Sequence, residues 1–292
     1  MPNLKEVRLR IASVNSTQQI TKAMKMVSAA KLRRAQNAIQ QLRPYANKLR
    51  DILENLSATL EESDGGQFAK VRPVNKVLIV AVSSNRGLAG AFNSNIIRTV
   101  NRLLSEQYAA QVKTGGVKVL CIGKKGSDFY SKNKNVYGGN HNAIFADLSF
   151  DRVSSIAEGI MTDFSEAKYD QVIVVYNQFK NAAVQIVTTE QLLPIQPPAK
   201  SEGKMKNDYI FEPSKEEIVL ELIPKSIKTQ LYKAVLDSHA SEHGARMTAM
   251  NKATDNAGEL LKGLRLSYNK ARQAAITNEI LEIVAGAEAL NG

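Results

Sequence analysis

The sequence predicts an α/β domain inserted between two long terminal helices that pair as an antiparallel coiled coil. Three observations support this fold class: a heptad series of apolar residues near the N-terminus, a second one near the C-terminus, and β-branched runs between them. Helices that leave an inserted domain from its two ends run in opposite directions. Each can therefore bury its apolar stripe against the other.

The N-terminal helix is predicted over residues 3–60, in a coiled-coil segment at 1–60. From Leu4, steps of three and four residues reach mostly apolar side chains, and a seam of this length is typical of a coiled coil. Pro44 is expected to bend the helix locally. Four consecutive seam positions are polar, while nearby apolar residues share another face, so we expect the stripe to rotate there. Either the helix meets a second partner, or its coil partner changes sides. The polar positions are Gln18, Thr21, Lys25 and Ser28, and the displaced apolar residues are Ile20, Met24 and Val27.

The central segment changes to a strand pattern. Residues 61–73, with Gly65, Gly66 and Pro73, are typical of a linker. Apolar runs at 76–82, 117–123 and 171–176 indicate strands buried on both faces. Helices are expected near 90–110, 124–132 and 151–168, an edge strand at 184–189, and a loop at 196–208. This alternation predicts a mostly parallel, Rossmann-like sheet in an α/β domain at 74–212.

The last segment, 213–292, is predicted to be the second coiled-coil helix. Ser214 and Glu217 form a capping box. Pro224 is expected to break the helix once, with an unbroken stretch over 226–289. One heptad seam comprises Leu261, Leu264, Tyr268, Ala271 and Ala275, and an offset series comprises Ile276, Ile280, Ile283, Ala287 and Leu290.

Positive charge is concentrated at the N-terminal end. The chain of 292 residues has a formal net charge of +11, and residues 1–50 contain 11 Lys and Arg against one acid, Glu6. No acid lies between residues 7 and 50, so the basic side chains lack partners on their own helix. This imbalance favours an anionic partner, either nucleic acid, lipid headgroups or an acidic protein surface. Tyr45 is the only aromatic residue of the segment, which argues against stacking on single strands.

Other patterns exclude some classes of protein and leave weak candidates for sites. No run approaches the roughly 18 apolar residues of a membrane span. The turn at 83–90, SSNRGLAG, lies where a phosphate could bind, but the alternative is a tight turn without a ligand. His239, Glu242 and His243 match a zinc-peptidase pattern without an evident third ligand, and the alternative is two surface histidines. Cys121 cannot form an internal disulfide and is expected to be a small buried apolar residue.

Three long runs resemble the gamma subunit of F-type ATP synthases. They are QITKAMKMVSAAK at 19–31, ARMTAMNKATDNA at 245–257 and YNKARQAAITNEI at 268–280, and the turn at 83–90 is also similar. The resemblance implies a rotor subunit that is not itself catalytic. It would couple proton flow through a membrane ring to ATP synthesis and hydrolysis. The paired helices would form a shaft inside a ring of nucleotide-binding subunits, with the α/β domain as its foot.

The resemblance also implies partners and contact residues. The partners would be the alpha and beta subunits of the catalytic ring, the epsilon subunit and the membrane c-ring, with no nucleic acid and no cofactor. The tail IVAGA at 283–287 would sit in an apolar bearing. Contacts with the catalytic ring would be made by Lys22, Met24, Lys25, Arg33, Arg34, Arg272, Gln273 and Thr277, and contacts with the membrane ring by Tyr209, Phe211 and Glu212.

The expected location is peripheral, on the cytoplasmic face of a bacterial plasma (inner) membrane. Cys121 alone cannot form the regulatory disulfide of chloroplast gamma subunits, and no transit peptide is recognisable. Two other classes of protein remain open at this point. One is a basic coiled-coil protein that binds nucleic acid, and the other is a zinc hydrolase at His239, Glu242 and His243.

Overall fold

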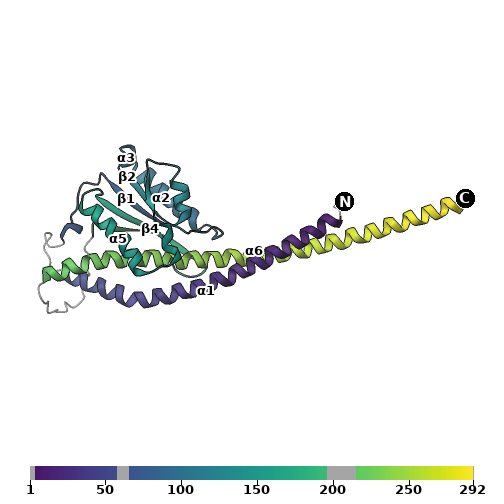
Figure 1. Ribbon diagram of the computed structural model, residues 1–292, viewed down its shortest axis with the longest axis horizontal. Helices are drawn as coiled ribbons and strands as arrows, with labels where there is room; N and C mark the ends of the chain where they lie inside the picture. The colour runs from purple at the N-terminus through teal and green to yellow at the C-terminus, as the bar shows by residue number, and fades with distance from the viewer. Residues whose placement is uncertain (1–3, 58–65, 196–214, 292) are drawn as a thin grey trace. The chain divides into compact units, whose positions relative to one another are not determined.

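The computed structural model describes residues 4–57, 66–195 and 215–291 (Figure 1). Its compact units are residues 1–28 with 247–292, called the tip unit below, and residues 29–246, called the sheet unit. Two long helices belong to both units, α1 (Leu4–Ser57) and α6 (Lys215–Asn291). Within the described ranges, no helix combines the length and the apolar character that a membrane crossing requires.

The sheet unit contains one five-stranded sheet with the order β3-β2-β1-β4-β5. Strands β3, β2, β1 and β4 are parallel, as the prediction of a mostly parallel sheet requires. Strand β5 is the predicted edge strand, and it pairs with β4 in the antiparallel direction. All six residues of β1 are buried, because helices cover both faces of a parallel sheet. The strands are β1 (Val77–Val82), β2 (Val117–Ile122), β3 (Tyr137–Asn140), β4 (Gln171–Phe179) and β5 (Gln185–Leu193).

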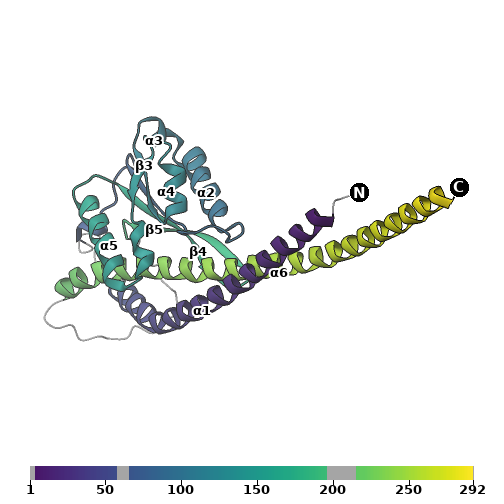
Figure 2. The same ribbon diagram turned by 45° about the vertical axis from the view of Figure 1, so that its right-hand side comes forward.

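Helices form a layer on each face of this sheet (Figure 2). On one face, α2 (Phe92–Arg102), α3 (Ala109–Lys113) and α4 (Lys124–Tyr130) cover a core that includes Ile79 and Ile96. On the other face, α5 (Phe150–Ser165) and the first part of α6 cover a core that includes Val80, Phe164 and Leu231. The C-terminal helix is therefore part of the sheet's own hydrophobic core.

The predicted break at Pro224 is wrong. Helix α6 runs through Pro224 without interruption. A proline inside a helix removes one hydrogen bond and costs about 3 kcal/mol. Its neighbours Ile223 and Ile227 are 6% and 1% exposed against the sheet. Burial of such side chains contributes about 1.5–3 kcal/mol each, which offsets the local cost. Helix α1 likewise continues through Pro44.

Two elements of the sheet unit were not expected. Strand β3 has the sequence YGGN, which lacks β-branched residues, and the missing side chain of Gly138 lets it approach β2 closely. The helix expected near 90–110 is divided by a π-helical turn, η2 (Leu103–Gln107). Short 3₁₀ turns also occur, at η1 (Gly66–Phe68) and η3 (Asn142–Ala146). The capping box at Ser214 and the loop at 196–208 lie outside the described residues.

The seam of α1 is its least exposed face in both units. Val7 in the tip unit and Leu32, Ala35, Ile39 and Leu49 in the sheet unit are 4–7% exposed. The heptad series counted from Leu4 therefore identified the buried face of this helix correctly.

A glycine after β2 provides a test of the sheet. Gly123 has φ +114°, and a Cβ added there would lie 2.1 Å from the carbonyl oxygen of Ser83. We expect Gly123→Ala to lower the free energy of unfolding by about 3 kcal/mol or more, measured by urea unfolding of the purified chain. The matched control is Gly159→Ala on α5, where a Cβ meets nothing within 4 Å. That control is expected to stabilise the helix by about 0.5–1 kcal/mol, and equal effects would contradict the argument.

Candidate functional site

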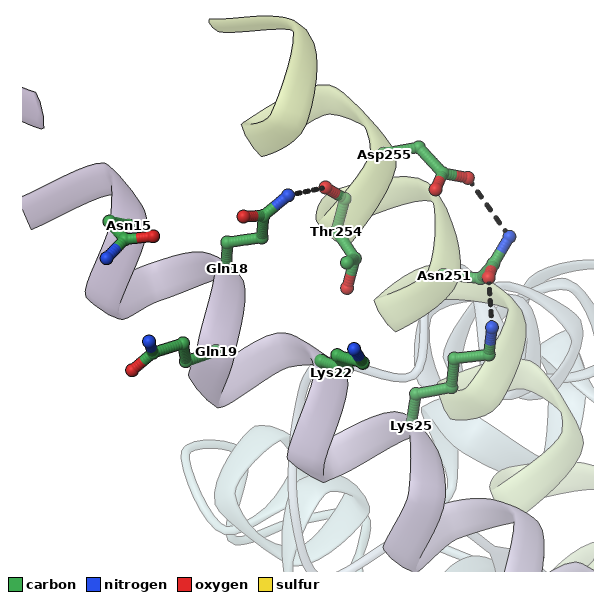
Figure 3. Close-up of a pocket in the computed structure, with 8 residues that line it drawn as sticks. All are labelled: Asn15, Gln18, Gln19, Lys22, Lys25, Asn251, Thr254 and Asp255. Carbon is green, nitrogen blue, oxygen red and sulfur yellow. Dashed lines mark hydrogen bonds between the residues drawn. The ribbon is translucent and has the colours of Figure 1, made fainter. Parts of the chain in front are cut away.

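A hydrogen-bonded polar layer lies between α1 and α6 in the tip unit (Figure 3). Thr254 donates from Oγ1 to Oγ1 of Thr21 at 2.8 Å, and Lys25 donates from Nζ to Oδ1 of Asn251 at 2.5 Å. Gln18 donates from Nε2 to the carbonyl oxygen of Thr254 at 3.4 Å. Residue numbers rise along α1 as they fall along α6, so the two helices are antiparallel here, as predicted.

Helix α6 stays on the heptad seam at the polar positions, so the alternative that the coil partner changes sides is wrong. The second partner expected at the displaced apolar residues stays a prediction. Thr21 and Ser28 are 8% and 3% exposed, whereas Ile20 and Val27 are 59% and 57% exposed. The polar residues therefore stay in the seam because α6 and the α1 backbone satisfy their hydrogen bonds. The apolar residues beside them are left on the surface of the tip unit.

A polar groove of about 350 Å³ opens along this layer. Figure 3 shows the Lys25–Asn251 bond continuing to Asp255, which accepts a hydrogen bond from Nδ2 of Asn251 at 3.1 Å. The side chains that line it carry amide, hydroxyl or charged groups. The lining residues are Asn15, Gln18, Gln19, Lys22, Lys25, Asn251, Thr254 and Asp255.

The predicted contact residues on α1 differ in environment. Lys22 lines the groove and is exposed, and Arg33 and Arg34 are exposed in the sheet unit. Met24 is half-buried, and the ammonium of Lys25 is bonded to Asn251, so Lys25 also holds the two helices together. Among the described residues, the ion pairs involve none of Lys22, Arg33 and Arg34.

The C-terminal part of α6 is exposed. The antiparallel register of the Thr21–Thr254 pair places Leu4, the first residue of α1, opposite Ala271. Beyond that point the described part of α1 does not extend along α6, so it does not cover the offset apolar series. Its members Ile276, Ile280 and Ile283 are 49%, 55% and 66% exposed.

The predicted contact residues on this part of α6 are also exposed. Arg272, Gln273 and Thr277 lie on the surface, and Thr277 donates from Oγ1 to the carbonyl oxygen of Gln273 at 2.9 Å. The predicted contacts with the membrane ring, Tyr209, Phe211 and Glu212, lie outside the described residues.

Of the histidines of α6, His243 is buried and His239 is half-buried, so their expected place on the surface is wrong. His243 is 5% exposed, and its ring meets that of His239 edge to face with centroids 4.5 Å apart. Burial lowers the pKa of His239 to about 4 and that of His243 to about 3, and the nearby cations Arg246 and Lys31 act in the same direction. Both imidazoles are therefore neutral at pH 7.

The same histidines do not form a zinc site. The Oε1 atom of Glu242 lies 2.7 Å from Nη2 of Arg246, and both side chains are almost fully buried. The carboxylate that a zinc hydrolase would use is thus paired with a guanidinium. Across the described ranges, no cluster of three or more His, Cys, Asp or Glu side chains could hold a metal ion.

The turn after β1 is bound to its own neighbours. The Oδ1 atom of Asn93 accepts the backbone N–H of Ser84 at 3.0 Å, and Arg246 donates to the carbonyl oxygens of Arg86 and Gly87. Gly90 and Leu88 have positive φ, which makes the tight turn expected as the alternative to a phosphate site. Cys121 is fully buried, as expected, and burial raises the pKa of its thiol to about 12.

Comparison with known proteins identifies the family. A family model described as ATP synthase matches residues 3–290. The ATP synthase gamma chain of Flavobacterium johnsoniae is 61% identical over 292 residues and covers all of both chains. The chain belongs to the ATP synthase gamma chain family. As a member, it is a rotor subunit of a membrane-associated complex and not the catalytic subunit.

Solved structures agree with this assignment. The central stalk and c-ring structure of Tetrahymena thermophila mitochondrial ATP synthase includes a chain with 28% identity and a TM-score of 0.60, over 80% of this chain and 99% of that one. A chain from Euglena gracilis mitochondrial ATP synthase is 21% identical with a TM-score of 0.70, over 98% of this chain and 94% of that one, and shares the fold. This chain thus shares its fold with chains of two mitochondrial ATP synthase structures.

Sequence reasoning missed the α6 side of both polar clusters. Asn251 and Thr254 complete the polar layer of the tip unit, and Glu242 with Arg246 forms a buried pair in the sheet unit. A signal was present, since Met250, Thr254, Ala257 and Leu261 continue a heptad seam on α6. Extending that seam toward the N-terminal side of Leu261 would have placed Thr254 opposite α1.

The buried histidine predicts a pH dependence. Because the folded pKa of His243, about 3, is below the ordinary value of 6.5, the unfolded chain binds more protons as the pH falls below 6.5. Folding stability is therefore lost on acidification. We expect His243→Gln to lose about 2 kcal/mol less stability than the wild type between pH 7.5 and pH 5, measured by urea unfolding at both values. The same pH dependence in both proteins would show that His243 is not held neutral.

Proposed function

We propose that this chain is the central-stalk shaft of a bacterial F-type ATP synthase, coupling proton flow through a membrane c-ring to ATP synthesis and hydrolysis. Its partners are the alpha and beta subunits of the catalytic ring, the epsilon subunit and the c-ring. The complex lies at the cytoplasmic face of the plasma membrane, and the chain touches the membrane only through its partners. Full-length identity of 61% to a bacterial gamma chain carries this proposal.

The first contact level lies on α1. Lys22, Arg33 and Arg34 are exposed on a helix with no acid between residues 7 and 50. Such a face favours an acidic protein surface. Half-buried Met24 lies beside exposed Ile20 and Val27, so the partner at this level meets apolar as well as basic groups. Lys25 contributes in a different way, because its bond to Asn251 orients the pair of helices beneath these contacts.

The second contact level lies on α6. Arg272, Gln273 and Thr277 are exposed near the point where α1 begins, so partner subunits can reach them from all sides of α6. Arg272 offers a fork of donors for a carboxylate, and the amide of Gln273 can donate and accept. The exposed Ile280, Ile283 and Val284 beyond them suit an apolar bearing. Contacts with the c-ring through Tyr209, Phe211 and Glu212 remain part of the proposal.

Rotation couples distant sites through this rigid element. A shaft whose faces differ makes unequal contacts with each catalytic site at a given angle, and each angle therefore favours a different set of site conformations. The contact residues on α1 and those on α6 lie at different positions along their helices. They can therefore contact different segments of the partner subunits. Unequal contacts, and not a bound ligand, carry the coupling.

Purification separates the rotor from the remaining alternatives. We expect a tagged chain to co-purify with alpha, beta and epsilon subunits at low and moderate salt, and the chain alone to show no ATP hydrolysis. Robust turnover by the isolated chain would contradict a non-catalytic role. DNA binding that weakens steeply with salt, without ATP synthase partners, would instead indicate a nucleic-acid-binding protein.

The second contact level predicts a coupling defect. Replacing Arg272 and Gln273 together by Ala should lower ATP synthesis per assembled complex by about tenfold, because a charge-assisted hydrogen bond contributes about 1.5–3 kcal/mol. Complex content is measured by immunoblot and synthesis in inverted vesicles. The control is Arg102→Ala on the exposed surface of α2. Parallel losses of synthesis and of assembled complex would mean that the pair only holds the complex together.

A further inference from the structure

The sheet unit has the strand order in which open α/β proteins bind ligands. In the order β3-β2-β1-β4, the chain crosses from one side of β1 to the other, which leaves a crevice at the carboxyl ends of β1 and β4. In such sheets this crevice is the usual place for a nucleotide or another small molecule. The contents of the crevice in this chain therefore decide what the sheet unit does.

A segment of α6, residues 239–246, fills this crevice and is called the joint below. Arg246 donates from Nη2 to the carbonyl oxygen of Arg86 at 3.0 Å and from Nε to that of Gly87 at 3.3 Å, both in the turn after β1. Ser241 donates from Oγ to the carbonyl oxygen of Asn177, near the end of β4, at 2.9 Å. The helix thus occupies the position of a ligand.

Two further contacts hold the joint from other directions. The ring of His239 stacks on Phe145, in the turn that follows β3, with centroids 5.7 Å apart and planes at 16°. A Cβ added to Gly244 would lie 3.2 Å from Cα of Ala182, in the hairpin between β4 and β5. Glycine at this position therefore allows the helix backbone to approach the hairpin closely. Loops that follow three parallel strands contact this single stretch of α6.

The joint concentrates the directional contacts between α6 and the sheet, whereas the contact before it is mainly apolar. The polar contacts there are long, from Nε2 of Gln230 to Oε2 of Glu190 at 3.4 Å and to the carbonyl oxygen of Gln191 at 3.3 Å. Before the joint, Ile223, Ile227 and Leu231 pack as an apolar stripe, and apolar packing is non-directional. A helix held only in that way resists sliding and turning about its axis weakly. The hydrogen bonds of Arg246 and Ser241 are directional, and they hold the helix at one rotation relative to the strands.

The polar groups of the joint also order one another. Glu242 lies 2.7 Å from Nη2 of Arg246, and Nδ1 of His243 lies 3.3 Å from Nη1. A neutral His243 can accept from the guanidinium at Nδ1, whereas a protonated ring would oppose it. Two nitrogens of the guanidinium, Nη2 and Nη1, therefore meet acceptors on the same helix, in Glu242 and His243. This orients the other N–H groups of Arg246 toward the turn after β1.

We propose that the joint is the torque-transmitting contact between the sheet and α6, and that Arg246 is its positioning residue. The inference rests on the rotor function proposed above and deepens it. The membrane ring would turn the α/β domain, and the bonds of Arg246 to the turn at 86–87 would prevent α6 from slipping against the sheet. The joint lies in the sheet unit, so a rotation of the α/β domain would reach α6 through these contacts.

The test compares variants in the assembled enzyme. Arg246→Lys keeps a cation beside Glu242 but cannot donate to both carbonyl oxygens. We expect it to lower ATP-driven proton pumping per ATP hydrolysed by about threefold or more, since a joint that slips loses part of the coupling between sites. Arg102→Gln alters only the exposed surface of α2, so it should stay within about twofold of wild type.

A cross-link provides a second readout that a purely structural role would not change. Ala182→Cys with Gly244→Cys, placed in the Arg246→Lys background, should restore pumping per ATP on oxidation and lose it again on reduction. The native Cys121 is fully buried and would not interfere. If Arg246→Lys reduces the amount of assembled complex, pumping is calculated per assembled complex. Rescue by the cross-link then distinguishes a slipping joint from a loss of assembly.

Two results would contradict the proposal that the joint transmits torque. Arg246→Lys complexes that pump normally per ATP would show that torque passes elsewhere, and so would a defect that the cross-link leaves unchanged. Failure of the rotor function itself would look different. In that case, complexes assembled without the chain would pump as well as complexes that contain it, with either Arg or Lys at position 246.

Discussion

The fold depends on the need of a parallel sheet for cover on both faces. Helices α2, α3 and α4 cover one face, but on the other α5 is joined by the C-terminal helix, whose Ile227 and Leu231 are 1% and 0% exposed. The sheet unit therefore cannot complete its core until the end of the chain has been made. This requirement brings the C-terminal helix back to a domain inserted far before it and makes α6 part of that domain.

Polar residues have a different role from apolar ones in these helices. Apolar seams supply most of the stabilisation, but they tolerate shifts in register and rotation. The Thr21–Thr254 and Lys25–Asn251 bonds of the tip unit fix one alignment of α1 with α6. In the sheet unit, the buried Glu242–Arg246 pair has a similar role. Buried polar pairs add little net stability, so their value here lies in specifying one arrangement.

The sequence predicted elements wherever one local pattern dominated. The β-branched runs identified β1, β2 and β4, and heptad spacing identified the buried face of α1. Strand β3 was missed because Gly138 allows a close approach to β2 and Gly139 has a positive φ of +116°, and neither residue favours a strand by propensity. Continuation of α6 through Pro224 depends on packing against residues distant in the sequence, which no local rule includes.

The site was predicted less completely, for a related reason. Family motifs marked the stretches of α1 and α6 that carry contacts, but a motif does not tell whether a polar side chain faces a partner or the neighbouring helix. Lys25 and Lys22 are three residues apart in one motif, yet one is bonded to Asn251 and the other is exposed. Similarly, the burial of His243 follows from the loops that surround it.

The exposed end of α6 affects the solubility of the chain before it assembles with its partners. Ile276, Ile280, Leu281, Ile283 and Val284 are 49–66% exposed on a stretch that α1 does not reach. Contiguous apolar surface of this kind promotes self-association in a free polypeptide. A newly made copy is thus safest when its partners are already present in matching amounts. Balanced synthesis of the subunits would then act as a form of quality control for this one.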